Sequence, residues 1–150
     1  MIQQAAESLV RLYDADETAW LDEMAELIQQ GRRDELDYAH LGEYLTDMAR
    51  RDRREVESRL TTLLMHLLKW MHQPDHRLKS WRGTIIEQTQ ELFEDAESGV
   101  LRNHAEAVLA KAYAKAVQRA GAETGLPAQT FPRECPYTLD QLFSVDFTAE

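Results

Sequence analysis

The feature that most limits how this chain can fold is the stretch 43–73, which contains neither glycine nor proline. These two residues weaken or end helices more than any others, so this stretch can form one long helix. Leucine and alanine are abundant in the chain, whereas valine and isoleucine are few, which favours helix over strand. The sequence therefore predicts an all-α fold and argues against a β-sandwich or a glycine-rich doubly wound sheet.

The second half of this stretch is the most apolar part of the chain. In residues 60–71, eight of twelve side chains are Leu, Met or Trp. On a helix they would cover an arc of roughly 220°, wider than the ~100° stripe of a surface helix. We expect this segment to be the central helix, contacted on two sides and ended by Pro74.

Apolar residues at helical spacing predict further helices over 2–13, 16–30, 80–97 and 101–120. Asp14 or Asp16 is placed to cap the second of them, and Asp37 to cap the long helix. In the helix predicted over 80–97, we expect one apolar face formed by Trp81, Ile85, Leu92, Phe93 and Ala96.

Beyond Gly121 the chain becomes rich in proline and phenylalanine. Residues 138–141 have the spacing of a capping box, which predicts one more short helix. We expect an up-down bundle of four to five main helices over 16–120, with a tail over 121–150 packed across it. The interpretation is a single helical domain spanning 1–150.

The charge pattern bears on location and partners. The formal net charge is −10 at pH 7, which argues against non-specific binding to nucleic acid or anionic membranes. The single Cys135 excludes an intrachain disulfide and fits a reducing compartment. The start lacks the pattern of a secretory signal, and the longest apolar runs are far shorter than the ~20 residues that cross a bilayer. We expect an acidic cytoplasmic protein with no membrane segment.

The run Leu63-Leu64-Met65-His66-Leu67-Leu68-Lys69-Trp70, followed by Gln73-Pro74 and Ser80-Trp81, resembles the signature of domain-of-unknown-function family twenty-nine, a bacterial family of small helical proteins. Further marks are Tyr13-Asp14, Asp16, Trp20, Leu36-Asp37, Leu41, Glu43, Gly125-Leu126-Pro127, Phe131-Pro132 and Cys135-Pro136-Tyr137. The likeness covers roughly residues 13–147. The chain departs from the family pattern at Tyr44, Ala49, Thr89 and Ser98-Gly99-Val100. The resemblance implies an all-helical fold and no particular activity.

Metal binding is one functional reading. His40 and Glu43 share a helical face, and His66 lies at the border of the apolar arc. Any of them would need ligands from another helix, and the Glu-x-x-His pairs of di-iron bundles are absent. We therefore favour the reading without a metal ion or cofactor.

Catalysis is a second reading. His66 could act as an acid–base group in a pocket walled by Trp70 and Trp81, but no nucleophile stands near it in the sequence. Cys135 has no neighbour that would activate its thiol. We favour a half-buried structural His66, a packing role for Cys135 and no catalytic residue, so the protein is more consistent with a non-enzymatic role than with an enzyme.

The leading hypothesis is a small binding or interaction protein with a protein partner, as a monomer or a homodimer. Its predicted surface comprises His66, Lys69, Trp70, Gln73, Trp81 and Arg82. The alternative is a metal-binding protein or enzyme that uses His66, or His40 with Glu43. Third is nucleic-acid binding by the basic region 50–82, with its charge supplied by Arg50, Arg51, Arg53, Arg54, Lys69, Arg77, Lys79 and Arg82.

Overall fold

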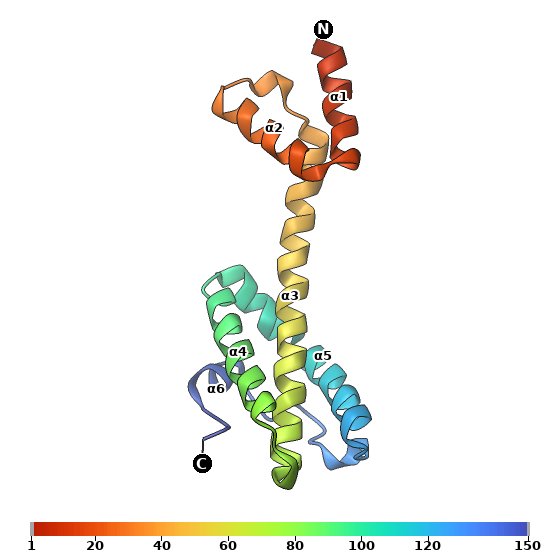
Figure 1. Ribbon diagram of the computed structural model, residues 1–150. Coiled ribbons are helices and arrows are strands. Elements are labelled where there is room, and N and C mark those ends of the chain that lie inside the picture. Colours follow the sequence, from red (N-terminus) through yellow and green to blue (C-terminus); the bar gives the residue numbers. More distant parts are fainter. Residues whose placement is uncertain (1, 150) are drawn as a thin grey trace. The chain divides into compact units, whose positions relative to one another are not determined.

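The structure is a computed structural model that describes residues 2–149, with side chains over 5–149. It contains six α-helices and no strand among these residues (Figure 1). The helices are α1 (Ile2–Ala15), α2 (Glu17–Gln29), α3 (Tyr38–His72), α4 (Lys79–Asp95), α5 (Gly99–Thr124) and α6 (Leu139–Ser144). Three short 3-10 helices connect them: η1 (Arg33–Glu35), η2 (Pro74–His76) and η3 (Ala128–Thr130). The predicted all-α fold is confirmed.

The chain folds into two compact units, Met1–Arg50 and Arg51–Glu150. The first contains α1, α2, η1 and the beginning of α3. The second contains the rest of α3 and everything after it. The single domain over 1–150 stays a prediction, and each unit is described below by itself.

In the first unit, the helix ends follow the sequence signals. Asp16 is the N-cap of α2, and its carboxylate accepts a hydrogen bond from the Ala19 amide at 3.1 Å. Gly31, just beyond this helix, has a φ of 72°, a conformation that glycine adopts without steric cost. Trp20 and Met24 are at most 2% exposed and form the unit's core.

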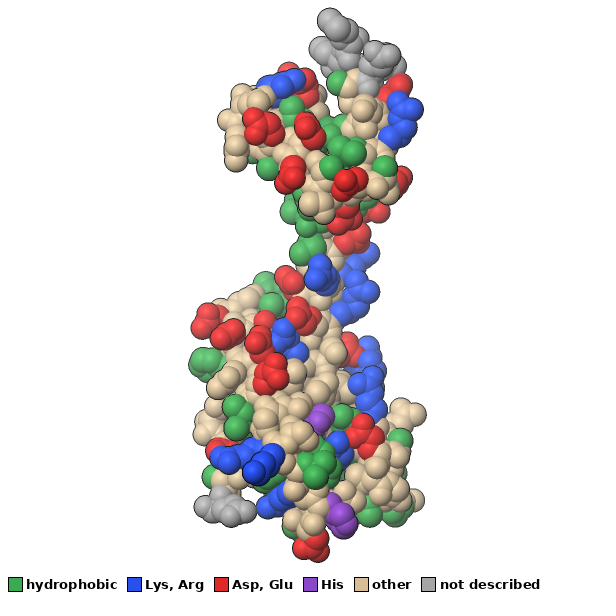
Figure 2. Space-filling view, viewed as in Figure 1, with side chains coloured by type: hydrophobic (Ala, Val, Ile, Leu, Met, Phe, Trp, Pro, Cys, Tyr) green, Lys and Arg blue, Asp and Glu red, His purple; other side chains and the backbone are tan. Residues whose placement is uncertain are grey.

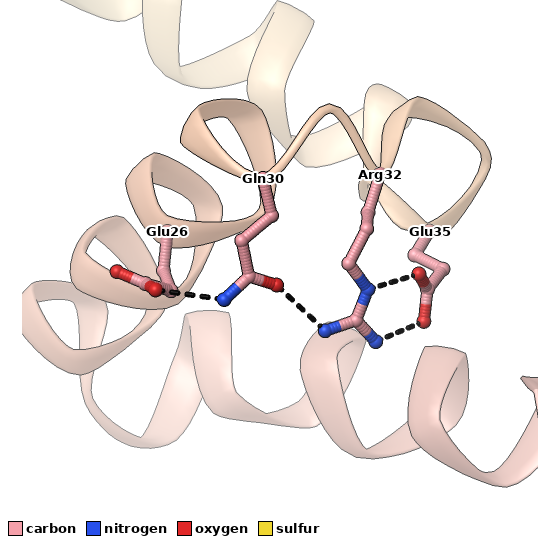
Figure 3. A network of polar contacts seen from close by, with 4 residues as sticks. All are labelled: Glu26, Gln30, Arg32 and Glu35. Atoms are coloured by element: carbon pink, nitrogen blue, oxygen red, sulfur yellow. Dashed lines mark hydrogen bonds and ion pairs between the residues drawn. The ribbon is translucent and has the colours of Figure 1, made fainter.

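A polar network closes the turn between α2 and η1 (Figure 3). The Gln30 amide donates to Glu26 at 2.7 Å, and its oxygen accepts from Arg32 at 2.9 Å. The Arg32 guanidinium also forms two hydrogen bonds to the Glu35 carboxylate, a geometry that fixes both planes. The pairing lowers the pKa of Glu35. These contacts hold the polar connection in one conformation.

In the second unit, the apolar half of α3 lies at the centre. Leu60, Leu63, Leu64, Leu67 and Leu68 are each at most 1% exposed. The long helix is unbroken from Tyr38 to His72 and ends before Pro74, because proline lacks an amide donor. The prediction that this segment is buried is confirmed.

Helices α4 and α5 cover α3 with different residues. From α5, Ala112, Ala116 and Ala120 are fully buried, and their small side chains permit close helix approach. From α4, Ile85 and Leu92 are buried. Phe93 is 56% exposed, so the prediction that it shares their face is wrong. One residue advances a helix by 100°, which turns Phe93 away from the side on which Leu92 lies.

The C-terminal tail packs on this core as predicted. Phe131, Leu139 and Leu142 are buried in it, and Thr138 forms the expected capping box with Gln141 at the start of α6. Helix α5 runs to Thr124, beyond the predicted end at 120. The left-handed stop is Gly125, with a φ of 75°.

Tyr113 of α5 gives a pH-dependent prediction. Its hydroxyl donates to the Pro132 carbonyl at 2.5 Å, and burial raises its pKa to about 12. In the unfolded chain this hydroxyl would lose its proton near the ordinary tyrosine pKa of 10.0. Stability should therefore be unaffected by this group below that pH, and should fall as the pH rises toward 12. Phenolate absorbance during an alkaline titration should lack this late step in Tyr113→Phe; identical curves would contradict the assignment.

Candidate functional site

The predicted surface is partly turned into the protein. Lys69 and Trp70 are each only 7% exposed. The Lys69 ammonium donates to the Glu123 carboxylate of α5 at 2.6 Å and lies 4.7 Å above the Trp81 ring of α4. Lys69 of α3 therefore contacts both α4 and α5, and its positive charge is paired with Glu123 within the protein.

The other residues of the predicted surface differ in how exposed they are to solvent. The Arg77 guanidinium lies 4.5 Å from the centre of the Trp70 ring, and its Nε donates to the Trp70 carbonyl at 3.0 Å. Gln73 and Trp81 are partly buried, whereas Arg82 is exposed. The six-residue surface as a whole stays a prediction, but Lys69 and Trp70 do not face solvent.

His66 is half-buried and turned toward its own helix. Its Nδ1 lies 2.8 Å from the Thr62 carbonyl, and because a carbonyl can only accept, this ring nitrogen is the donor. Burial lowers the pKa of His66, which favours the neutral ring at neutral pH. These contacts are those of a structural histidine at the edge of a core.

His40 belongs to a buried cluster in the first unit. The Asp37 carboxylate accepts from the His40 amide at 3.3 Å, and its Oδ2 lies 2.7 Å from the ring Nδ1. It also accepts from the Trp20 indole at 3.2 Å. The Tyr13 ring stacks on the His40 ring at 4.2 Å. Asp37 thus caps α3, as predicted, and joins it to α2.

Glu43, the other candidate ligand, is exposed to solvent. Within the part of the chain that the structure describes, no group of three or more His, Cys, Asp and Glu side chains could hold a metal ion. The metal site suggested by the sequence therefore stays a hypothesis without a described ligand group.

Cys135 lines a groove of about 740 Å³ between α5 and the tail. Its thiol donates to the Tyr137 carbonyl at 3.4 Å, and burial raises its pKa. The thiol therefore stays protonated at neutral pH, which makes it a poor nucleophile. The packing role expected for Cys135 fits these contacts.

Helix α4 carries an exposed apolar surface that was not predicted from the sequence. Ile86 is 40% exposed and Phe93 is 56% exposed; seven residues apart, they lie about 20° apart on the helix. The Phe93 ring packs edge-on against Phe143 of α6 at 5.5 Å. Val145, which follows α6, is 47% exposed.

A groove of about 270 Å³ is lined by Ile86, Phe143 and Val145, and Phe93 lies beside it through its contact with Phe143. Its floor includes Leu63 and Leu67 of α3, and its walls include Ile86 and Gln90 of α4 and Val145 of the tail. We call the groove, with Ile86, Phe93, Phe143 and Val145, the α4 groove. A signal for it existed in the sequence, because Ile86 and Phe93 are seven residues apart on a helix whose other apolar side chains face elsewhere.

The charged side chain that borders the α4 groove is acidic: it is the exposed Asp146 of the tail. Glu94, which directly follows Phe93 on α4, is also exposed. The Thr148 hydroxyl donates to Asp146 at 2.7 Å and lowers its pKa, with a smaller contribution from Arg82. Figure 2 shows hydrophobic and acidic side chains beside one another on the α4 side of this unit. The surface combines apolar contact area with negative charge.

The fold and these surfaces define a small all-α protein whose buried polar side chains support helix packing. No described helix has both the length and the hydropathy needed to cross a membrane. The chain belongs to the family described as Domain of unknown function DUF29, whose model matches residues 12–148. The resemblance seen in the sequence is therefore confirmed. No curated protein and no solved structure matches the chain significantly.

Proposed function

We propose that this protein is a non-enzymatic interaction protein that docks a helical segment of a partner protein in the α4 groove. The observation that carries the proposal is the exposed apolar row of Ile86 and Phe93 beside a groove with an apolar floor. Amphipathic helices bind such grooves through residues spaced three, four and seven apart. Covering these side chains would remove apolar area from water, which is the main driving force of protein association.

The rim indicates the chemistry of the partner. One carboxylate, that of the exposed Asp146, borders the α4 groove, and the exposed Glu94 directly follows Phe93 in the chain. A partner helix with Lys or Arg beside its apolar stripe would meet complementary charge. A second copy docking face to face would bring acids against acids, and nucleic acid would also be repelled. The partner is thus a basic amphipathic helix, which agrees with the hypothesis of a protein partner.

Arg82, one of the six surface residues predicted from the sequence, is exposed and lies near the α4 groove. It lies four residues before Ile86, one helical turn away on the same side of α4. Trp81 supports this turn from within by its contact with Lys69. We propose that the protein works in the cytoplasm as a monomer, consistent with its single Cys135 and with the like charges of this rim.

The experiment places a photo-crosslinking amino acid at Gln90, an exposed residue of the groove wall, in the full chain inside the producing cell. We expect a covalent adduct whose partner peptide is amphipathic and carries Lys or Arg. In the same protein, Phe93→Asp should lower the adduct yield by about tenfold or more, because it adds charge to the exposed apolar row that the partner helix covers.

Leu45→Asp is the matched control, because Leu45 is 59% exposed and lies outside the groove. It should leave the adduct yield unchanged, and circular dichroism should show that both variants remain helical. An adduct with a second copy of the chain, an acidic partner peptide, or equal yields from the two variants would refute the proposal.

A further inference from the structure

A second surface of the Arg51–Glu150 unit has the opposite charge. Helices α3 and α5 enclose a hollow of about 310 Å³, here named the α3/α5 hollow. Four basic side chains line this hollow: Arg54, Lys111, Lys115 and Arg119. The one carboxylate in its lining is that of Glu57. Figure 2 shows Lys and Arg side chains along this side of the unit. The chain as a whole has a net charge of −10, so the positive charge of this hollow is a local feature and not a property of the whole surface.

The three α5 bases are four residues apart, so they form one row on the helix. The Glu57 carboxylate accepts from Lys115 at 2.7 Å and from Lys111 at 3.2 Å. Hydrogen bonds from these lysines lower the pKa of Glu57. Lys111 and Lys115 nevertheless remain 64% and 45% exposed, so their other N–H groups can reach a ligand.

Two cations of the hollow have no such internal acid. Among residues 2–149, no ion-pair partner is described for Arg54 or Arg119. The exposed Ser58 adds a hydroxyl donor, and Thr61 lies at the base of the hollow. Guanidinium, ammonium and hydroxyl groups, which line this hollow together, are donors that bind phosphate oxygens in proteins.

We propose that the α3/α5 hollow binds a phosphate monoester, the group carried by nucleotides and by phosphorylated small molecules. Glu57 would act as an internal competitor, since its carboxylate occupies lysine donors that a phosphate could use. The site is separate from the α4 groove and goes beyond the proposed function.

The surroundings favour a small ligand over a polymer. Ser58 also borders a neighbouring hollow between α3 and α4, which is lined by Glu55, Glu87 and Glu91. The one cation there, Arg59, is already paired with Glu55, Glu91 and Asp95. A nucleic-acid strand that extended past Ser58 would meet these acids, whereas a compact phosphate would not.

The experiment titrates the full chain calorimetrically at low salt with inorganic phosphate, with AMP and with a short single-stranded oligonucleotide. We expect saturable binding of phosphate and AMP, and tighter AMP binding would show that the nucleoside also contributes. Arg119→Gln should weaken AMP binding by about tenfold, the size of one charged hydrogen bond. Arg133→Gln removes an exposed arginine outside the hollow and should change nothing.

Glu57→Gln distinguishes competition from mere support of the fold. Removing its charge should strengthen AMP binding severalfold, whereas a residue that only holds the helices in place would weaken it when replaced. Absence of saturable phosphate and AMP binding, equal losses in Arg119→Gln and Arg133→Gln, or unchanged or weaker binding in Glu57→Gln would overturn the proposal. So would an oligonucleotide bound about a hundredfold more tightly than AMP, which would indicate a nucleic-acid surface.

Discussion

Leu64→Ala is expected to lower the free energy of unfolding by about 3 kcal/mol, within the range for fully buried leucines. Leu64 is fully buried in α3, at the centre of the Arg51–Glu150 unit. Truncation removes its apolar contacts and leaves a cavity that the surrounding side chains fill only in part. Urea unfolding followed by tryptophan fluorescence measures the loss, since Trp70 and Trp81 pack in the same unit.

Leu78→Ala is the matched control, because it removes the same atoms from a residue that is 53% exposed. We expect a change within about 0.5 kcal/mol, as for most surface substitutions. Equal losses from the two variants would mean that the apolar half of α3 is not the centre of the unit. The burial on which the other conclusions depend would then be incorrect.

Asp37→Ala is expected to destabilise the first unit by roughly 3 kcal/mol, the sum of a lost N-cap and one buried donor without a partner. Its carboxylate caps α3 through the His40 amide and accepts from the buried Trp20 indole. Without it, the indole N–H remains buried with no acceptor. Hydrogen exchange of the α2 amides measures the effect, and they should exchange about a hundredfold faster than in the wild type.

Asp34→Ala is the control for this unit, because Asp34 is an exposed acid three residues earlier in the chain. It should leave α2 exchange nearly unchanged. Asp37→Asn retains an oxygen that can cap the helix and should fall between the two. If Asp34→Ala and Asp37→Ala had the same effect, the loss would reflect net charge and not the contacts of Asp37.

The candidate surfaces were only partly predictable. Residues Lys69 and Trp70 come from the right helix but face inward, because Glu123 and Trp81 from two other helices surround the lysine. The basic region 50–82 suggested a surface formed by bases close together in the chain, whereas the α3/α5 hollow combines Arg54 with bases of α5. Helical spacing shows which residues share a face, but not which face a distant helix covers.

The sequence by itself determined the helices, their caps and the buried centre. These features depend on neighbours within one or two turns: Asp16 caps α2, Pro74 follows the end of α3, and the Leu-rich run must leave water. Only the tertiary structure decided that Phe93 faces solvent beside Phe143 and that Lys115 meets Glu57. Those contacts join residues far apart in the chain, and their geometry depends on how whole helices pack.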